Sequence, residues 1–146
     1  MLKIYTYPHK VLSKVSEPVT LIDKKIRRMV DAMVETMDYH KGIGIAAPQI
    51  GESKRIAIAK FEGRLIALIN PYVISHSDTL IDSVEGCLSV PNYEGIIKRY
   101  SSITVTAFNI EGKESTATYH GLLACIILHE IDHLNGKLIS DYRRLL

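Results

Sequence analysis

The chain has 146 residues, of which 47% are hydrophobic and 23% are charged. A chain of this length buries roughly two thirds of the surface that it exposes when unfolded, so we expect one core and a single catalytic domain over residues 1–146. Lysine and arginine exceed the acidic residues by only two (18 against 16) and are scattered, which argues against a protein with a nucleic-acid-binding basic face.

The amino terminus lacks the features of a signal peptide, namely an apolar core followed by a cleavage site of small residues. No apolar run approaches the roughly 20 residues that span a membrane. These observations predict a cytoplasmic protein, and the reducing cytoplasm disfavours disulfides. The two cysteines, Cys87 and Cys125, are therefore expected to act as a ligand or as core residues.

The first 40 residues divide into an arm and a helix. Residues 1–20 contain Pro8 and Pro18 among residues of mixed polarity, which predicts an extended arm. From Ile22 to His40 the apolar residues recur every three or four positions, and Asp23 can cap the first turn. We therefore predict an amphipathic helix here, with its methionines in the core.

Residues 42–51 interrupt the helical pattern with three glycines and one proline. They do not form a phosphate-binding loop, because they match neither GxxxxGKS, GxxxxGKT nor GxGxxG. Small residues in this stretch allow the backbone to approach a ligand or another strand closely. Gln49 is the polar exception among Ile, Ala and Pro, and its amide either satisfies buried backbone or points into a site.

The middle of the chain has the pattern of antiparallel strands. Residues 55–60 and 64–74 alternate or run apolar on either side of a Glu-Gly pair, and residues 101–119 repeat the pattern around a second Glu-Gly pair. We therefore predict two hairpins. The stretch 83–91 between them is interpreted as a loop between strands.

A second helix is predicted from Gly121 to Gly136, where Asn135-Gly136 forms a natural C-cap. The final ten residues are interpreted as a short tail.

The second helix carries the sequence His129-Glu130-Ile131-Asp132-His133. His129 and His133 are i and i+4 neighbours, so their imidazoles share one face of the helix and can bind one metal ion. Such an ion needs at least one more protein ligand from elsewhere in the chain. Helix geometry alone leaves open whether Glu130 or Asp132 faces the ion, but the HExxH pattern indicates that Glu130 is the general base of a metal hydrolase.

Three other interpretations compete with a hydrolase of this kind. Residues 121–127 are strongly apolar, so the helix can simply be buried with hydrogen-bonded imidazoles. An HExxH motif alone also suits a metal-dependent endopeptidase. The third alternative is a homologue that binds metal without catalysing a reaction.

Three motifs occur in a fixed order: Gly42-Ile-Gly-Ile-Ala-Ala-Pro-Gln49, Glu85-Gly-Cys87-Leu-Ser89 and His129-Glu-Ile-Asp-His133. With these motifs the chain resembles the peptide deformylases over essentially its whole length. The resemblance implies an α+β fold, in which antiparallel sheets surround a central helix that carries HExxH. It also implies a metal-dependent hydrolase that removes the formyl group from the N-formylmethionine of nascent polypeptides and releases formate.

The resemblance also implies roles for individual residues. The implied metal ligands are Cys87, His129 and His133, with Glu130 as the acid/base. Gln49 and the backbone N–H of Leu88 are implied as donors to the oxyanion. The implied substrate-binding residues are Ile43, Gly44, Glu85, Leu122, Cys125 and Ile126, and Glu85 is expected to pair with Arg99 behind the site.

The implied cofactor is one divalent metal ion per chain, with Fe²⁺ expected and Zn²⁺, Ni²⁺ or Co²⁺ as alternatives. The implied partners are N-formylmethionyl peptides and nascent chains, with a transient ribosome contact but no direct binding to nucleic acid or membrane. The tail is shorter than the ribosome-docking helix of many bacterial members. Three residues also depart from the family pattern, namely Leu128 before HExxH, Ser83 in place of an apolar residue and Glu94 in place of a basic one.

Overall fold

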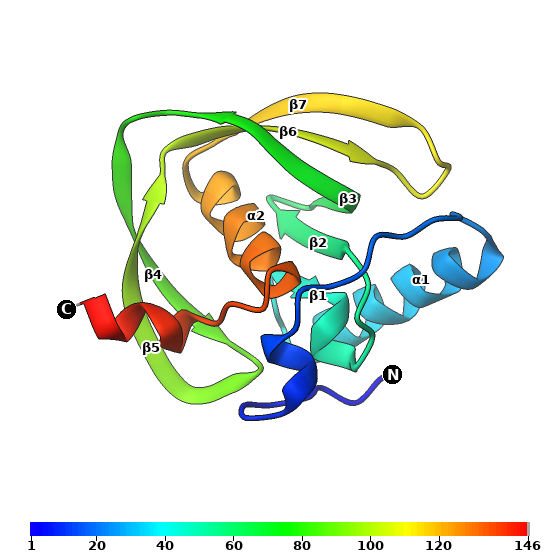
Figure 1. Ribbon diagram of the computed structural model, residues 1–146, viewed down its shortest axis with the longest axis horizontal. Coiled ribbons are helices and arrows are strands. Elements are labelled where there is room, and N and C mark those ends of the chain that lie inside the picture. Colours follow the sequence, from blue (N-terminus) through cyan, green and yellow to red (C-terminus); the bar gives the residue numbers. More distant parts are fainter. Residues whose placement is uncertain (146) are drawn as a thin grey trace.

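Helix α2 (Gly121–Leu134) lies between two antiparallel sheets in the computed structural model, which describes residues 1–145 (Figure 1). The first sheet has five strands in the order β1-β2-β3-β6-β7, and the second consists of β4 and β5. This arrangement confirms the predicted α+β fold. The remaining elements are η1 (Lys10–Ser13), α1 (Lys24–Tyr39), β1 (Gly44–Ala46), η2 (Ala47–Ile50), β2 (Ile56–Phe61), β3 (Arg64–His76), β4 (Leu80–Cys87), β5 (Val90–Tyr100), β6 (Ser102–Phe108), β7 (Glu114–His120) and η3 (Ile139–Leu145).

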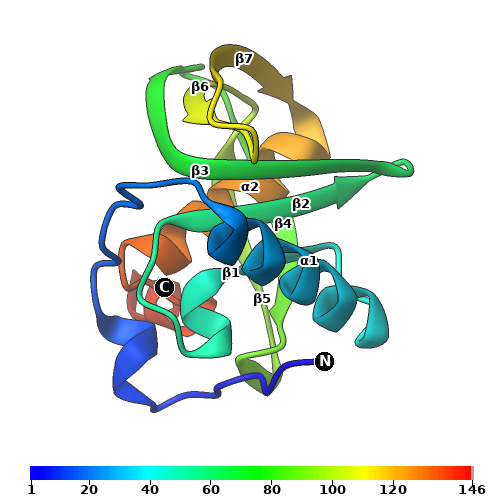
Figure 2. The ribbon, with the colours of Figure 1, turned by 90° about the vertical axis from the view of Figure 1, so that its right-hand side faces the viewer.

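Helix α1 confirms the predicted amphipathic helix. The carboxylate of Asp23 accepts a hydrogen bond from the Ile26 backbone N–H at 3.1 Å and so caps the first turn. Met33 and Met37 are fully buried, and they pack in one cluster with isoleucines of β2 and β3. In Figure 2, α1 lies on one side of β2 and β3, and the β6–β7 hairpin lies on the other.

Both predicted hairpins are present, as β2–β3 and β6–β7. Residues 62 and 63 both have positive φ (51° and 76°), the conformation that a tight hairpin turn requires. The interpretation of 83–91 as a loop is wrong, because most of it belongs to hairpin β4–β5. Strand β1 was also not predicted, because it has only three residues with small or apolar side chains.

Helix α2 begins and ends where the sequence predicts. Its apolar residues Leu123, Ile127 and Ile131 pack in a cluster with residues of β3, β6 and β7, which holds the helix against the five-stranded sheet. After Leu134 the chain turns at Gly136, whose φ is +74°. A β-carbon at this position would lie 2.6 Å from the Ser13 carbonyl oxygen, so only glycine fits the turn.

The amino-terminal arm is extended apart from η1, and it supports the loops beside α2. The backbone N–H of Tyr5 donates to the carbonyl of Gln49 at 2.7 Å, and that of Tyr7 donates to the carbonyl of Ser89 at 2.8 Å. The last ten residues are more than the predicted tail, since η3 packs against β5 and Tyr142 contacts Asp132 of α2. Within the described chain, no helix has the length and apolar character needed to cross a bilayer.

Candidate active site

Three potential metal ligands from two elements meet beside α2. Cys87 lies at the end of β4, and His129 and His133 lie one helical turn apart on α2. Their ligand atoms are all within 4.8 Å of one another, and the Cys87 Sγ is 3.3 Å from the His133 Nε2. Ligands at 2.0–2.3 Å around a tetrahedral ion are separated by roughly 3.5 Å, so this group fits one divalent ion.

The protonation of the two histidines also suits a bound cation. Burial, together with the charge on His129, holds the pKa of His133 well below its usual range, so its imidazole is neutral. Burial alone would lower the pKa of His129, but the negative charge of Glu130 and the contact with Cys87 raise it well above the usual range. A metal ion binds the neutral imidazole, so metal binding should displace a proton from His129.

The orientation of His129 is fixed from behind by a carboxylate. The Nδ1 of His129 lies 2.7 Å from the Glu85 Oε1, which leaves its Nε2 directed toward Cys87 and His133. Arg99 donates two hydrogen bonds to Glu85, from Nε at 2.9 Å and from Nη2 at 2.7 Å. The pairing of Glu85 with Arg99 expected from the sequence is therefore present, and both side chains are buried.

This ion pair predicts a pH-dependent stability. Burial alone would raise the pKa of Glu85, but the hydrogen bonds from Arg99 and His129 lower it from 4.5 to about 2. Glu85 therefore stabilises the fold above pH 4.5, and its contribution, on the order of 3 kcal/mol, is lost as the pH falls toward 2. We expect the free energy of unfolding of Glu85→Gln, measured by urea titration of metal-free protein, to depend less on pH over this range.

The matched control is Glu94→Gln, which removes an exposed glutamate from the neighbouring strand β5. This variant should keep the wild-type pH profile. An equal flattening in both variants would show that the Glu85–Arg99 pair is not the source of the pH dependence.

Glu130 is the carboxylate that faces the three ligands. Its side chain is buried, its Oε2 lies 4.0 Å from the His129 Nε2, and its Oε1 has no partner among the described residues. Burial raises the pKa of Glu130 to about 7, which suits a group that exchanges protons near neutral pH. Gly44 is required beside it, because a β-carbon at Gly44 would collide with the Glu130 carboxylate.

Asp132 points away from the ligands, so the structure distinguishes the two carboxylates that helix geometry left open. Its Oδ2 accepts hydrogen bonds from Arg99 Nη1 and from the Tyr142 hydroxyl, both at 2.6 Å. It does not line the cavity in front of the ligands.

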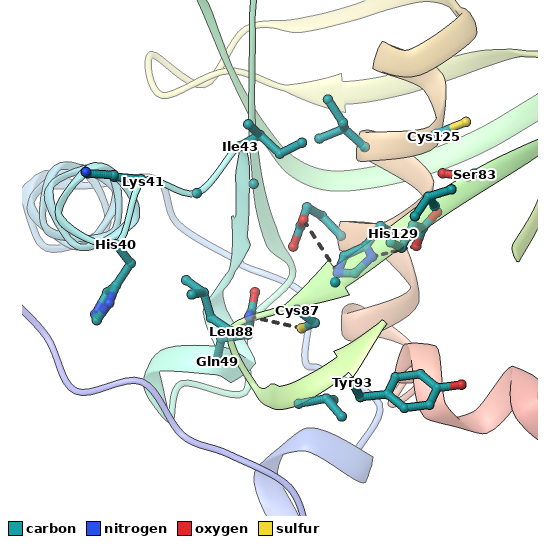
Figure 3. Close-up of a pocket in the computed structure, with 18 of the residues that line it drawn as sticks. His40, Lys41, Ile43, Gln49, Ser83, Cys87, Leu88, Tyr93, Cys125 and His129 are labelled. Carbon is teal, nitrogen blue, oxygen red and sulfur yellow. Dashed lines mark hydrogen bonds and ion pairs between the residues drawn. The ribbon is translucent and has the colours of Figure 1, made fainter. Parts of the chain in front are cut away.

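The Gln49 amide binds the backbone through its oxygen and faces the metal ligands through its NH₂ group. Its Oε1 accepts from the Ala46 backbone N–H at 2.9 Å, which is the structural role. Its Nε2 donates to the Ser89 hydroxyl at 3.2 Å and lies 3.7 Å from the Cys87 Sγ, so the NH₂ group is beside the ligands. Figure 3 shows Gln49 and Leu88 next to Cys87 on the same side of the site.

A cavity of about 510 Å³ opens in front of these residues. Buried walls are formed by Cys125 and Ile126, and Ile43 and Leu122, each 56% exposed, also line the cavity. Every site residue suggested by the sequence lines this cavity except His133, which is almost fully buried behind Cys87. The cavity is also lined by His40, Lys41, Val84, Asn92 and Tyr93, whose residue types carry no sequence signal of a site.

The three departures from the family pattern have different positions. Leu128 is partly buried and packs against the core around α2, so it replaces a polar residue with a packing contact. Ser83 is buried and lines the cavity with Cys125, which adds a hydroxyl to its wall. Glu94 is exposed on β5 and lies outside the lining of the cavity.

Comparisons with known proteins agree with this site. The family model described as polypeptide deformylase matches residues 1–145. A peptide deformylase of Rhizobium meliloti (strain 1021) is 45% identical over 140 residues, which cover 92% of this chain and 80% of that protein. The crystal structure of peptide deformylase from Thermotoga maritima superposes with a TM-score of 0.95 at 35% identity, covering 97% of this chain and 96% of that one.

A third relative was solved with a peptide. The Met-Ala-Ser-bound class I type b peptide deformylase from Acinetobacter baumannii has a TM-score of 0.92 and 29% identity, with 97% of both chains covered. A family model that spans nearly the whole chain, relatives above 40% identity and a Cys/His/His metal site therefore agree. The chain belongs to the polypeptide deformylase family and is a metal-dependent hydrolase with peptide deformylase activity.

Proposed function

We propose that Cys87, His129 and His133 hold one divalent metal ion and that Glu130 is the acid/base for removal of the formyl group. The observation that carries this proposal is the placement of a buried, partnerless carboxylate oxygen beside three ligand atoms within 4.8 Å of one another. One thiolate and two neutral imidazoles suit a borderline-soft divalent ion. When bound, the ion supplies Lewis acidity, which polarises a carbonyl and makes water more acidic.

Glu130 moves the proton. With its pKa raised to about 7 by burial, Glu130 accepts a proton from the attacking water and then donates it to the departing amine. The products are formate and a free amino terminus. Because the unpartnered Oε1 has no competing hydrogen bond among the described residues, it is free to take up this proton.

We propose that the Gln49 NH₂ group and the Leu88 backbone N–H donate to the oxyanion that forms on the formyl oxygen. The Gln49 side chain is only 2% exposed, and Ala46 and Ser89 hold its amide in place. A donor that is fixed before the reaction stabilises developing charge without reorganising.

Loss of this donor gives the first catalytic prediction. We expect Gln49→Leu to lower kcat by roughly two orders of magnitude, the usual effect of removing one oxyanion donor. Metal content should stay at the wild-type level, and KM should change much less than kcat. Loss of the Ala46 contact will lower the unfolding temperature, so kcat must be normalised to the folded fraction. A folded variant with wild-type kcat would leave Gln49 with a structural role alone.

The cavity accounts for substrate recognition. We propose that the methionine side chain enters between Leu122, Cys125 and Ile126, in a cavity that the buried Glu85 also lines. Ile43 and Gly44 line the cavity at the start of β1, an edge strand that can pair with an extended peptide. The relative from A. baumannii, whose structure contains Met-Ala-Ser, supports the binding of a peptide by this chain.

The native ion is proposed to be Fe²⁺, with Zn²⁺, Ni²⁺ and Co²⁺ as ions that the same ligands accept. We further propose that residues 1–146 act as one catalytic domain in the cytoplasm, where nascent chains carry N-formylmethionine. A transient contact with the ribosome would deliver that substrate.

The experiment that tests this function is formate release from formyl-Met-Ala peptides under anaerobic conditions, with Fe²⁺ or Ni²⁺ restored to the protein. We expect turnover of the formylated peptide and no cleavage of internal peptide bonds. Cleavage of unformylated internal bonds would instead support an endopeptidase. Full metal loading without any turnover would support a catalytically silent homologue.

A further inference from the structure

Hydrogen bonds connect the C-terminal helix η3 to the His129 imidazole. The Tyr142 hydroxyl donates to the Asp132 Oδ2 at 2.6 Å, and Arg99 Nη1 donates to the same oxygen at 2.6 Å. Arg99 then donates twice to Glu85, whose Oε1 lies 2.7 Å from the His129 Nδ1. The roles proposed above do not use the Tyr142 hydroxyl or the Asp132 carboxylate.

Local structure fixes the position of Tyr142. The turn at Gly136 allows the chain to pass close to Ser13 and to continue into η3, which packs against β5. Asp141 Oδ2 then accepts a hydrogen bond from the Leu138 backbone N–H at 2.8 Å, and the Leu138 side chain is buried. The segment that carries Tyr142 is therefore held at both ends of its first turn.

The Tyr142 ring is also held by two cations. The Arg99 guanidinium carbon lies 5.2 Å from the ring centroid, and the Lys137 Nζ lies 5.0 Å from it. Burial, followed by the hydrogen bond to Asp132 and the negative charge of that carboxylate, raises the pKa of the hydroxyl to about 12, so it remains a hydrogen-bond donor at neutral pH.

The Asp132 carboxylate links Tyr142 to Arg99, because both side chains donate to its Oδ2. Arg99 uses Nε and Nη2 for Glu85 and Nη1 for Asp132, and the same Nη1 also donates to the Tyr142 hydroxyl at 3.3 Å. The orientation of its planar guanidinium therefore depends on both carboxylates and, more weakly, on the tyrosine. Without the Tyr142 hydroxyl, Asp132 loses one of its two side-chain donors and can rotate away from Arg99. A tilted guanidinium would then shift the Glu85 oxygen that contacts His129.

The geometry points to Tyr142 as a positioning residue for the metal site, which acts on the orientation of His129 through Asp132, Arg99 and Glu85. This inference rests on the proposed role of His129 as a metal ligand. Through Tyr142, helix η3 would therefore help to position a ligand of the metal ion.

The test compares Tyr142→Phe with Tyr100→Phe in the protein of residues 1–146. Tyr142→Phe removes only the hydroxyl, whereas Tyr100 lies on the same strand as Arg99 and its hydroxyl has no partner among the described residues. For Tyr142→Phe we expect Zn²⁺ release to a chelator to be roughly threefold to tenfold faster, less than the 10–100-fold effect of a direct outer-shell partner. The visible absorption bands of the Co²⁺-substituted variant should also shift. Tyr100→Phe should leave both readouts unchanged.

A double-mutant cycle tests the route of the effect. In an Asp132→Ala background, Tyr142→Phe should accelerate Zn²⁺ release much less than in the wild type, because the shared acceptor is gone and only the longer contact between Tyr142 and Arg99 remains. Should Asp132→Ala not fold, the Co²⁺ spectra of the two tyrosine variants decide alone. Unchanged release and an unchanged spectrum in Tyr142→Phe would overturn the inference, as would the same acceleration with and without Asp132. A separate measurement tests the ligand assignment on which this inference rests. Stoichiometric metal in Cys87→Ala would show that the proposed ligand set is wrong, whatever the result for Tyr142.

Discussion

Glu130→Gln should retain its metal ion and lose most of its turnover. Glu130 is not one of the three proposed ligands, whereas an amide cannot accept the proton that a carboxylate accepts. We expect kcat to fall by roughly 10²- to 10⁴-fold, the range typical of a lost general base, with peptide binding preserved because the cavity walls are unchanged. Elemental analysis, formate release and peptide affinity measured on one preparation check all three expectations.

Asp132→Asn is the matched control for this prediction, because it makes the same chemical change two residues away on the same helix. Asp132 accepts hydrogen bonds from Arg99 and Tyr142 and does not line the cavity. This variant should therefore lose more stability and less kcat than Glu130→Gln. Loss of turnover in Asp132→Asn, with metal and fold intact and with Glu130→Gln still active, would reverse the two assignments.

Cys87→Ala and His133→Ala should each lose bound metal and, with it, activity. A catalytic ion needs at least three protein ligands to be retained, so an ion held by only two of them can dissociate. Elemental analysis after gel filtration is the measurement. Cys125→Ala provides the matched control, since it removes a thiol from the cavity wall on α2 outside the ligand group. Stoichiometric metal in Cys87→Ala would exclude its thiolate as a ligand.

Sequence patterns were sufficient for the elements that bury apolar residues with a regular period. Helix α1 follows from its helical periodicity, and the hairpins β2–β3 and β6–β7 follow from alternation and turn residues. Helix α2 follows from its apolar run and its Asn135-Gly136 end. The i, i+4 spacing of His129 and His133 likewise predicted that two imidazoles would share a face.

Strand β4 escaped prediction because the site itself changes its pattern. Its inward positions are polar, with Ser83, Glu85 and Cys87 facing α2, while the apolar Val84 between them is 66% exposed. The alternation of a half-buried strand is therefore inverted, and the stretch resembles a loop. The polar site residues of β4 are therefore also the reason why its sequence does not predict a strand.

The choice between Glu130 and Asp132 could not be made from helix geometry because both lie at the edge of the histidine face. The distinction depends on residues distant in the sequence, since Arg99 and Tyr142 engage Asp132 while Gly44 leaves room for the Glu130 carboxylate. A tyrosine in an apparently short tail carries no signal of such a contact.

The most direct test of the metal site is anomalous diffraction from crystals of the Fe²⁺-loaded protein, measured at the iron absorption edge. The assignment predicts one peak per chain, roughly 2.0–2.3 Å from the Cys87 Sγ and from one imidazole nitrogen each of His129 and His133. A peak at other residues, or a loaded and active protein with no peak at these three atoms, would contradict it.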